Sequence, residues 1–267
     1  MSSSSTGLWA SDDAYEKYMG RWSRRIAPHF LDWLSIPAKA NWIDIGCGTG
    51  VLSSTILAKC TPSSVVGIDP SEAFVEAAKA QVSDSRFRCE SGDGEALSFK
   101  DGEFSVAVSG LVLNFVGDKN KAVAEMKRVV SPGGSVALYV WDYAGHMQIM
   151  RHFFDTASEL DDRAKEFDDG VKAPICRPGP LSHLFKEAGL ADIEVQYLDI
   201  PAAFDNFDEY WMPFLGGTGS APKYCTSLAP DAQARLREKL RSRVPTGPDG
   251  EILLAVRAWA IKARVTK

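Results

Sequence analysis

Three glycines at alternate positions form the stretch of this 267-residue chain whose residues most clearly suit chemistry. Gly46, Gly48 and Gly50 follow the apolar run Trp42–Ile45, which contains one carboxylate, Asp44. An apolar run that breaks into glycines and then into a second apolar segment predicts a strand, a tight turn and a helix. Because glycine lacks a Cβ and adopts positive φ, such a turn lets a ligand approach the backbone amides at the helix start.

The spacing of the glycines argues against a dinucleotide. A dinucleotide fingerprint requires G-x-G-x-x-G, and Val51 stands where the last glycine would be. Asp44 would also lie unfavourably beside a pyrophosphate, whereas a carboxylate there suits a ligand that carries an ammonium and a sulfonium. The turn therefore favours a sulfonium ligand over NAD or FAD.

A second carboxylate belongs to the same predicted site. Residues 65–69 are an apolar segment that ends in Asp69, and the order strand, helix, strand predicts parallel pairing. Asp69 then emerges at the same sheet edge as the glycine turn, roughly 20 residues after it, where a carboxylate accepts hydrogen bonds from ribose hydroxyls. Pro70, directly after it, and Cys47, inside the turn, are placed in the same predicted site.

These motifs resemble the nucleotide-binding region of the class I S-adenosylmethionine-dependent methyltransferases, over residues 41–141 well and elsewhere in outline. The resemblance implies S-adenosylmethionine as cofactor and S-adenosylhomocysteine as product. It also implies that the Asp93 carboxylate accepts from the adenine amino group and that the Gly94 amide donates to the ring. The segment containing Leu111 would contact the methionine part of the cofactor through backbone groups.

The region 12–36 is predicted to form a helical cover. Its apolar and aromatic residues recur at helical intervals and predict one or two helices, with possible breaks near Gly20 and Pro28. The sequence of residues 18–23 is similar to the N-terminal segment of part of the same family, in which the N-terminal helices cover the cofactor. We therefore expect Tyr18 and Arg24 to lie over the cofactor. Arg24 could pair with a ligand carboxylate in a bidentate way. The alternative is that this stripe is a packing face.

The fold implied by the resemblance is α/β: a Rossmann-like, seven-stranded, mostly parallel sheet with helices on both faces and an antiparallel last strand. The family's last two strands form a hairpin, but here about 50 residues separate them, which is too many for a turn. We therefore expect helical lid insertions at about 143–178 and 204–248 in a single methyltransferase domain spanning 12–267, after a flexible N-terminus at 1–11. The alternative is that the aromatic residues of the insertion only pack in the core of the lid.

Composition limits the partners. The formal net charge of -5 gives no general attraction to nucleic acid or to an anionic membrane. Five dispersed cysteines without C-x-x-C or zinc-like spacing predict neither a disulfide framework nor a metal site. The serine-rich start does not resemble a signal peptide, and no apolar run is long enough to span a bilayer. We expect a cytoplasmic protein, monomeric or homodimeric.

The expected activity is transfer of a methyl group by in-line displacement to a small, partly apolar or aromatic metabolite, similar to the ubiquinone and menaquinone methyltransferases. The sequence assigns no catalytic residue; among its histidines, His146 is the least poor candidate for a base. An RNA or protein methyltransferase is one alternative, for which the charged segment 235–243 is the only basic candidate. A non-catalytic cofactor-binding protein and a nicotinamide dehydrogenase are two others.

Overall fold

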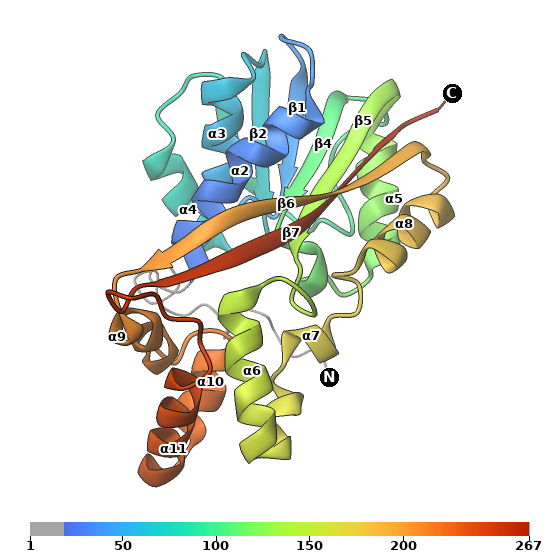
Figure 1. The fold of residues 1–267 in the computed structure, drawn as a ribbon. Helices are drawn as coiled ribbons and strands as arrows, with labels where there is room; N and C mark the ends of the chain where they lie inside the picture. Colours follow the sequence, from blue (N-terminus) through green and yellow to red (C-terminus); the bar gives the residue numbers. More distant parts are fainter. Residues whose placement is uncertain (1–18, 267) are drawn as a thin grey trace. The chain divides into compact units, whose positions relative to one another are not determined.

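The computed structural model describes residues 19–266, and its centre is a seven-stranded sheet of order β3-β2-β1-β4-β5-β7-β6 (Figure 1). The strands are β1 (Asn41–Ile45), β2 (Ser64–Asp69), β3 (Phe87–Ser91), β4 (Phe104–Gly110), β5 (Val130–Trp141), β6 (Ala191–Phe204) and β7 (Ile252–Arg264). Strand β1 pairs in parallel with β2 and β4, β2 with β3, and β4 with β5. The predicted Rossmann-like sheet is confirmed.

The last strand runs against its neighbour β5. Near the start of β5 the Gly133 amide donates to the Val265 carbonyl, and just past its end the Asp142 amide donates to the Arg257 carbonyl. The residue numbers of the β7 partners fall as the residue numbers along β5 rise, so β5 and β7 are antiparallel. This confirms the expected antiparallel last strand. The alternating polar and apolar residues at 193–198 predict a strand there, and the structure extends this strand, β6, to Phe204.

Five helices precede, connect or follow the strands β1 to β5 along the chain, outside the helical group described below. They are α2 (Arg21–Leu34), α3 (Val51–Lys59), α4 (Glu72–Gln81), α5 (Lys119–Val129) and α8 (Pro178–Glu187). Helices α3 and α4 pack on β2, while α5 packs on β4 and on α8. Ser71 and Asp118, residue types that predict helix N-caps, both form them: the Ser71 hydroxyl accepts from the Phe74 amide, and the Asp118 carboxylate accepts from the Lys121 amide.

Helix α2 is one continuous helix rather than two. Pro28 lies inside it and does not break it, and the residues around Pro28, such as Ile26, Ala27 and Phe30, are fully buried. Proline removes one helical hydrogen bond, a loss that packing on both sides of the residue offsets. The possible break at Pro28 is therefore not realised.

A second group of helices comes from two parts of the chain: two helices follow β5, and three lie between β6 and β7. They are α6 (Gln148–Leu160), α7 (Asp169–Lys172), α9 (Phe207–Trp211), α10 (Ser220–Ser227) and α11 (Pro230–Arg241). Aromatic rings form their core: Phe153 stacks on Phe214 with ring centroids 4.5 Å apart, and the Tyr210 hydroxyl donates to the Ile149 carbonyl over 2.8 Å. The expected helical insertion between the last two strands is present.

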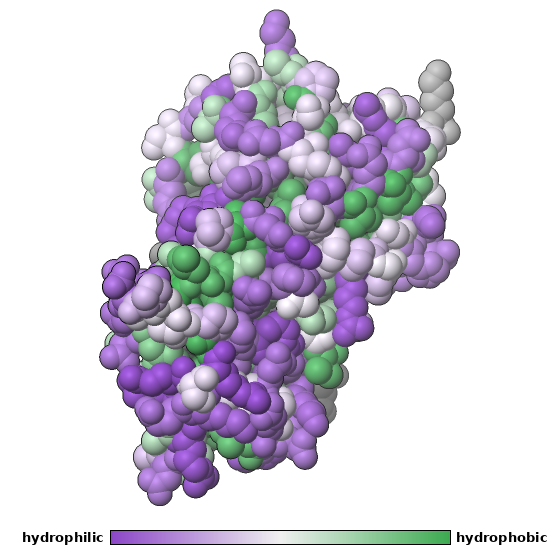
Figure 2. Space-filling view, in the orientation of Figure 1, coloured by the Kyte–Doolittle hydropathy of each residue, from purple (hydrophilic) through white to green (hydrophobic). Residues whose placement is uncertain are grey.

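The chain divides into two compact units. The sheet unit comprises residues 23–140, 177–198 and 259–267, and the helical unit comprises 141–176, 199–258 and the segment that ends at Trp22. The strands β5, β6 and β7 pass from one unit into the other. On the face seen in Figure 2 the surface is largely hydrophilic, and apolar residues form small separate groups.

Candidate functional site

The glycine turn after β1 is held in place by backbone hydrogen bonds. Gly46, Gly48 and Gly50 have φ of 75°, 53° and 87°, the left-handed region that glycine adopts without strain. The amides of Gly46 and Cys47 both donate to the carbonyl of Ile68 in β2, over 2.7 and 3.0 Å. The turn that opens helix α3 is thus held to the neighbouring strand by its own backbone.

Two of these glycines are required for different reasons. A Cβ on Gly46 would lie 2.5 Å from a methyl of Val112, so the segment after β4 packs directly on the turn. A Cβ on Gly48 would have no heavy atom of residues 19–266 within 4 Å, apart from its own chain neighbours. At Gly48 only the backbone angle favours glycine, and that face of the turn is open.

Asp69, at the end of β2, faces the turn. Its two carboxylate oxygens accept the amides of Gly48 and Ser71, each over 2.9 Å, and the residue is 7% exposed. Burial raises the pKa of this carboxyl, and the two amides partly oppose that rise. A carboxylate has about four acceptor sites, so Asp69 can still accept from hydroxyl groups such as those of a ribose.

Asp44 is the most unusual group of the site. It is 1% exposed; one oxygen accepts the Ser53 hydroxyl over 2.7 Å, and the other, Oδ1, is buried without a hydrogen-bond partner among residues 19–266. Burial raises its pKa to about 7; the Ser53 hydrogen bond opposes this rise and the nearby Asp69 charge adds to it. Because an unpaired buried carboxylate oxygen costs free energy, the position suits a ligand that brings a positive charge or a donor.

Cys47 is part of the turn but does not present its polar groups to a ligand. Its sulfur lies 3.5 Å from the sulfur of Cys89, its amide donates to Ile68, and its carbonyl accepts from Gly50. Pro70, in contrast, is exposed directly after Asp69. Only the backbone of Cys47 contributes to the site, by shaping the turn.

The loop after β3 holds the two residues expected to contact adenine. Asp93 is exposed, and one of its oxygens accepts the Glu95 amide over 2.8 Å, which makes a tight turn. Gly94 packs against the end of β1, because a Cβ there would lie 2.9 Å from a methyl of Ile45. The loop therefore lies beside the end of β1, next to the glycine turn, while its adenine role stays a prediction.

Leu111 follows β4 in a strained conformation. Its φ of 64° is rare for a residue with a Cβ, and its amide donates to the Tyr139 carbonyl over 2.8 Å. Strained backbone of this kind clusters at ligand sites. Leu111 also precedes Val112, the residue that packs on Gly46, so the segment lies beside the turn, while its contact with the cofactor stays a prediction.

The two residues of the predicted cover are Tyr18 and Arg24. Tyr18 lies outside the described residues, and Arg24 is exposed on α2. Their contact with a cofactor stays a prediction.

Sequence reasoning missed Ser53 and Val112. Ser53 is fully buried, and the signal for it was a small polar residue three positions after Gly50, on the apolar side of α3. Val112 had no comparable signal, because its contact with Gly46 joins two distant segments.

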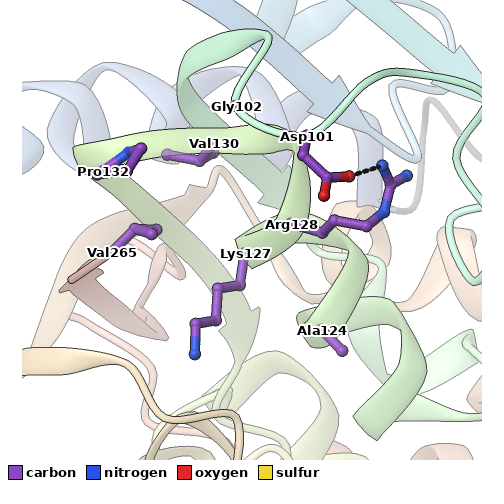
Figure 3. A pocket seen from close by; sticks show the side chains of 8 residues that line it. All are labelled: Asp101, Gly102, Ala124, Lys127, Arg128, Val130, Pro132 and Val265. Carbon is purple, nitrogen blue, oxygen red and sulfur yellow. Dashed lines mark hydrogen bonds and ion pairs between the residues drawn. The ribbon is translucent and has the colours of Figure 1, made fainter. Parts of the chain in front are cut away.

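One recess of the sheet unit lies elsewhere. It has a volume of about 420 Å³ and is shown in Figure 3, where Asp101 pairs with Arg128 over 2.8 Å. Its lining residues Gly102 and Val130 mark the amino ends of β4 and β5, whereas the glycine turn follows the carboxyl end of β1. In open α/β sheets ligands bind at the carboxyl ends, so this recess is not the candidate site.

Comparison with known proteins finds similarity to methyltransferases. Residues 43–138 match the family model described as a methyltransferase domain. The chain is 26% identical to trans-aconitate 2-methyltransferase of Deinococcus radiodurans over 244 residues, which cover 86% of this chain and 92% of that protein. It is 28% identical to demethylmenaquinone methyltransferase of Staphylococcus aureus over 169 residues, covering 58% and 69%.

The other comparisons define how far the likeness reaches. The chain spans about a third of the length of the first curated relatives it matches, 32% and 28%. The YcgJ protein of Bacillus subtilis aligns with a TM-score of 0.60 at 18% identity, covering 91% of this chain and 99% of that one, which shows the fold. Within residues 19–266, no helix combines the length and apolar character needed to cross a membrane.

Proposed function

We propose that this chain, which belongs through residues 43–138 to the class I S-adenosylmethionine-dependent methyltransferases, transfers a methyl group from S-adenosylmethionine to a small, partly apolar or aromatic metabolite. The observation that carries the proposal is the buried Oδ1 of Asp44, which has no partner among residues 19–266. A ligand that brings a positive charge or a hydrogen-bond donor would satisfy this oxygen, and this cofactor carries both an ammonium and a sulfonium.

In this proposal, different residues of the sheet unit bind different parts of the cofactor. Asp69 keeps acceptor capacity for ribose hydroxyls while the Gly48 amide fixes its orientation. Ser53 holds the Asp44 carboxylate in place. The open face at Gly48 lets a ligand approach the backbone of the turn.

When bound, the cofactor supplies a methyl group already activated on sulfur, which an acceptor displaces in line. The protein then has to align the acceptor and exclude water, and a base is needed only for an acceptor that must lose a proton. We assign no base, and the lid role of the insertions at 143–178 and 204–248 stays a prediction from the sequence.

The class of acceptor follows from charge and from the relatives. The formal net charge of -5 disfavours a nucleic-acid acceptor. Trans-aconitate 2-methyltransferase and demethylmenaquinone methyltransferase are both named for small-molecule acceptors, which supports a metabolite.

Calorimetric titration with S-adenosylmethionine and S-adenosylhomocysteine, followed by a methyl-acceptor screen, tests the proposal. The screen contains trans-aconitate, a demethylated quinone, bulk tRNA and a protein extract. We expect binding of both nucleosides and turnover with a small molecule. Asp69→Ala should weaken binding at least tenfold, whereas Asp101→Asn, which removes only an exposed partner of Arg128, should not.

Each rival has its own result. Binding without turnover would favour a non-catalytic binding protein, and turnover confined to tRNA or protein would replace the metabolite. Binding of NADH but not of the sulfonium nucleoside would overturn the assignment.

A further inference from the structure

A pair of cysteine thiols lies under the glycine turn. Cys47 of the turn and Cys89 of β3 have their sulfur atoms 3.5 Å apart, and the two residues are 6% and 7% exposed. All five cysteines are free thiols. A disulfide bond requires about 2.05 Å between the sulfur atoms, so the pair is about 1.5 Å from the bonded separation.

The sequence provides the space for this pair. Gly67 of β2 stands between the two strands, in register with Asp44 of β1 and with Cys89 of β3. A Cβ on Gly67 would lie 2.9 Å from the Cys47 sulfur and 3.3 Å from the Cys89 sulfur. The missing side chain of Gly67 is therefore what lets the thiols meet across β2.

The two thiols are not equivalent. The interaction between the two thiols lowers the pKa of Cys89, while the same interaction, burial and the nearby Asp44 raise the pKa of Cys47. The thiolate is the form that attacks an oxidant, so Cys89 is the nucleophile and Cys47 the resolving thiol.

We propose that Cys47 and Cys89 form a peroxide-sensitive dithiol, and that their oxidation to a disulfide weakens cofactor binding. The thiolate of Cys89 attacks one oxygen of hydrogen peroxide, the O–O bond breaks, and the released hydroxide takes up a proton to leave as water. The Cys47 sulfur then attacks the sulfenic sulfur of Cys89, the S–O bond breaks, and a second water leaves with the thiol proton. In sum, two thiols and one peroxide give one disulfide and two waters.

The consequence for the cofactor follows from the backbone on either side of Cys47. Its amide and carbonyl are both hydrogen-bonded within the turn, so a shift of its sulfur towards β3 displaces the turn itself. The next amide, that of Gly48, is the donor that orients Asp69. This second half of the inference rests on the proposed function, whereas formation of the disulfide does not.

The test compares reduced and peroxide-treated full-length protein. We expect the thiol count in denaturant to fall from five to three, a peptide map to show a Cys47–Cys89 disulfide, and the Kd for S-adenosylhomocysteine to rise about tenfold, with reversal by dithiothreitol. Cys89→Ala should bind as the reduced protein does and should not respond to peroxide. Cys225→Ser, which removes a buried thiol outside the pair, should respond fully.

Persistence of five thiols under peroxide, or a disulfide that leaves the Kd unchanged, would overturn the inference. A response that survives in Cys89→Ala would also overturn it. If the reduced protein fails to bind the nucleoside, the proposed function fails, and the thiol count and peptide map still decide whether the disulfide forms.

Discussion

At the scale of single residues, the ionisation of Asp44 should control cofactor affinity. Burial raises its pKa to about 7, so the carboxylate is mostly neutral at pH 6 and mostly ionised at pH 8. Only the ionised form attracts an ammonium or a sulfonium. We expect the Kd for S-adenosylhomocysteine to rise about tenfold between pH 8 and pH 6, as measured by titration calorimetry. Asp44→Asn should bind weakly and without this pH dependence; a profile like that of the parent protein would exclude Asp44 as its origin.

The same carboxylate should lower the stability of the protein without ligand. Its folded-state pKa lies above the value of 3.8 in an unfolded chain, so its contribution to stability is present below about pH 4 and is lost as the pH rises through 7. We expect Asp44→Asn to increase the free energy of unfolding at pH 8 by a few kcal/mol, about 4 at most, and to change little at pH 4. Urea unfolding at both pH values measures this, and a loss of stability at pH 8 would contradict it.

Ser53 and Ser54 offer a matched test of how Asp44 is held. The Ser53 hydroxyl donates to Asp44, whereas the hydroxyl of Ser54 donates to the carbonyl of Val51 in the same helix. Since the Ser53 hydrogen bond lowers the pKa of Asp44, Ser53→Ala should move the midpoint of the binding profile to higher pH. Ser54→Ala should leave it in place. Equal behaviour of the two variants would show that Ser53 does not position the carboxylate.

At the scale of the element, the turn between β1 and α3 depends on its packing as much as on its backbone angles. Gly46 and Gly48 both have positive φ, but only a Cβ on Gly46 would collide with Val112, at 2.5 Å. Gly48→Ala should therefore cost only backbone strain, about 1 kcal/mol, and Gly46→Ala several times more. Urea unfolding compares them.

The double variant Gly46→Ala/Val112→Ala separates the two causes. It removes the colliding methyl groups, so we expect it to recover part of the stability lost in Gly46→Ala. If the second substitution gives no recovery, backbone strain and not the contact with Val112 explains the loss.

The elements themselves were predictable wherever local pattern decides them. The apolar run that contains Asp44 and the run that ends in Asp69 are strands, and Ser71 and Asp118 begin helices, because those signals act over a few residues. The fate of the Cys47 side chain could not be predicted. It depends on Gly67 and Cys89, which come next to it only through strand register.

At the scale of the whole molecule, the order of the sheet followed from resemblance, and the need for an insertion followed from the long gap between the last two strands. The length of β6 could not be predicted in this way. Its final residues 199–204 contain Pro201, and they are extended because β6 pairs in the sheet with β7, which is distant in sequence. Likewise, the stack of Phe153 on Phe214 joins two segments about 60 residues apart, and no local periodicity announces such a contact.

The division into two units raises the question of whether they unfold together. All the structurally described residues of the candidate site belong to the sheet unit, and the stacked rings of Phe153 and Phe214 belong to the helical unit. However, β5, β6 and β7 each contribute residues to both units. Neither unit can lose its structure without disrupting strands that the other uses, so we expect one cooperative transition in scanning calorimetry.

Cofactor should move that single transition as a whole. A ligand at 100 times its Kd stabilises the folded state by about 2.7 kcal/mol, which for a chain of this size corresponds to a rise in Tm of roughly 5–10 °C. At the same concentration of S-adenosylhomocysteine, Asp69→Ala should show one transition that moves about half as far or less, because its Kd is at least tenfold higher. Two transitions in the parent protein, of which the nucleoside shifts only one, would mean that the shared strands do not couple the units and that the helical unit folds independently of the cofactor site.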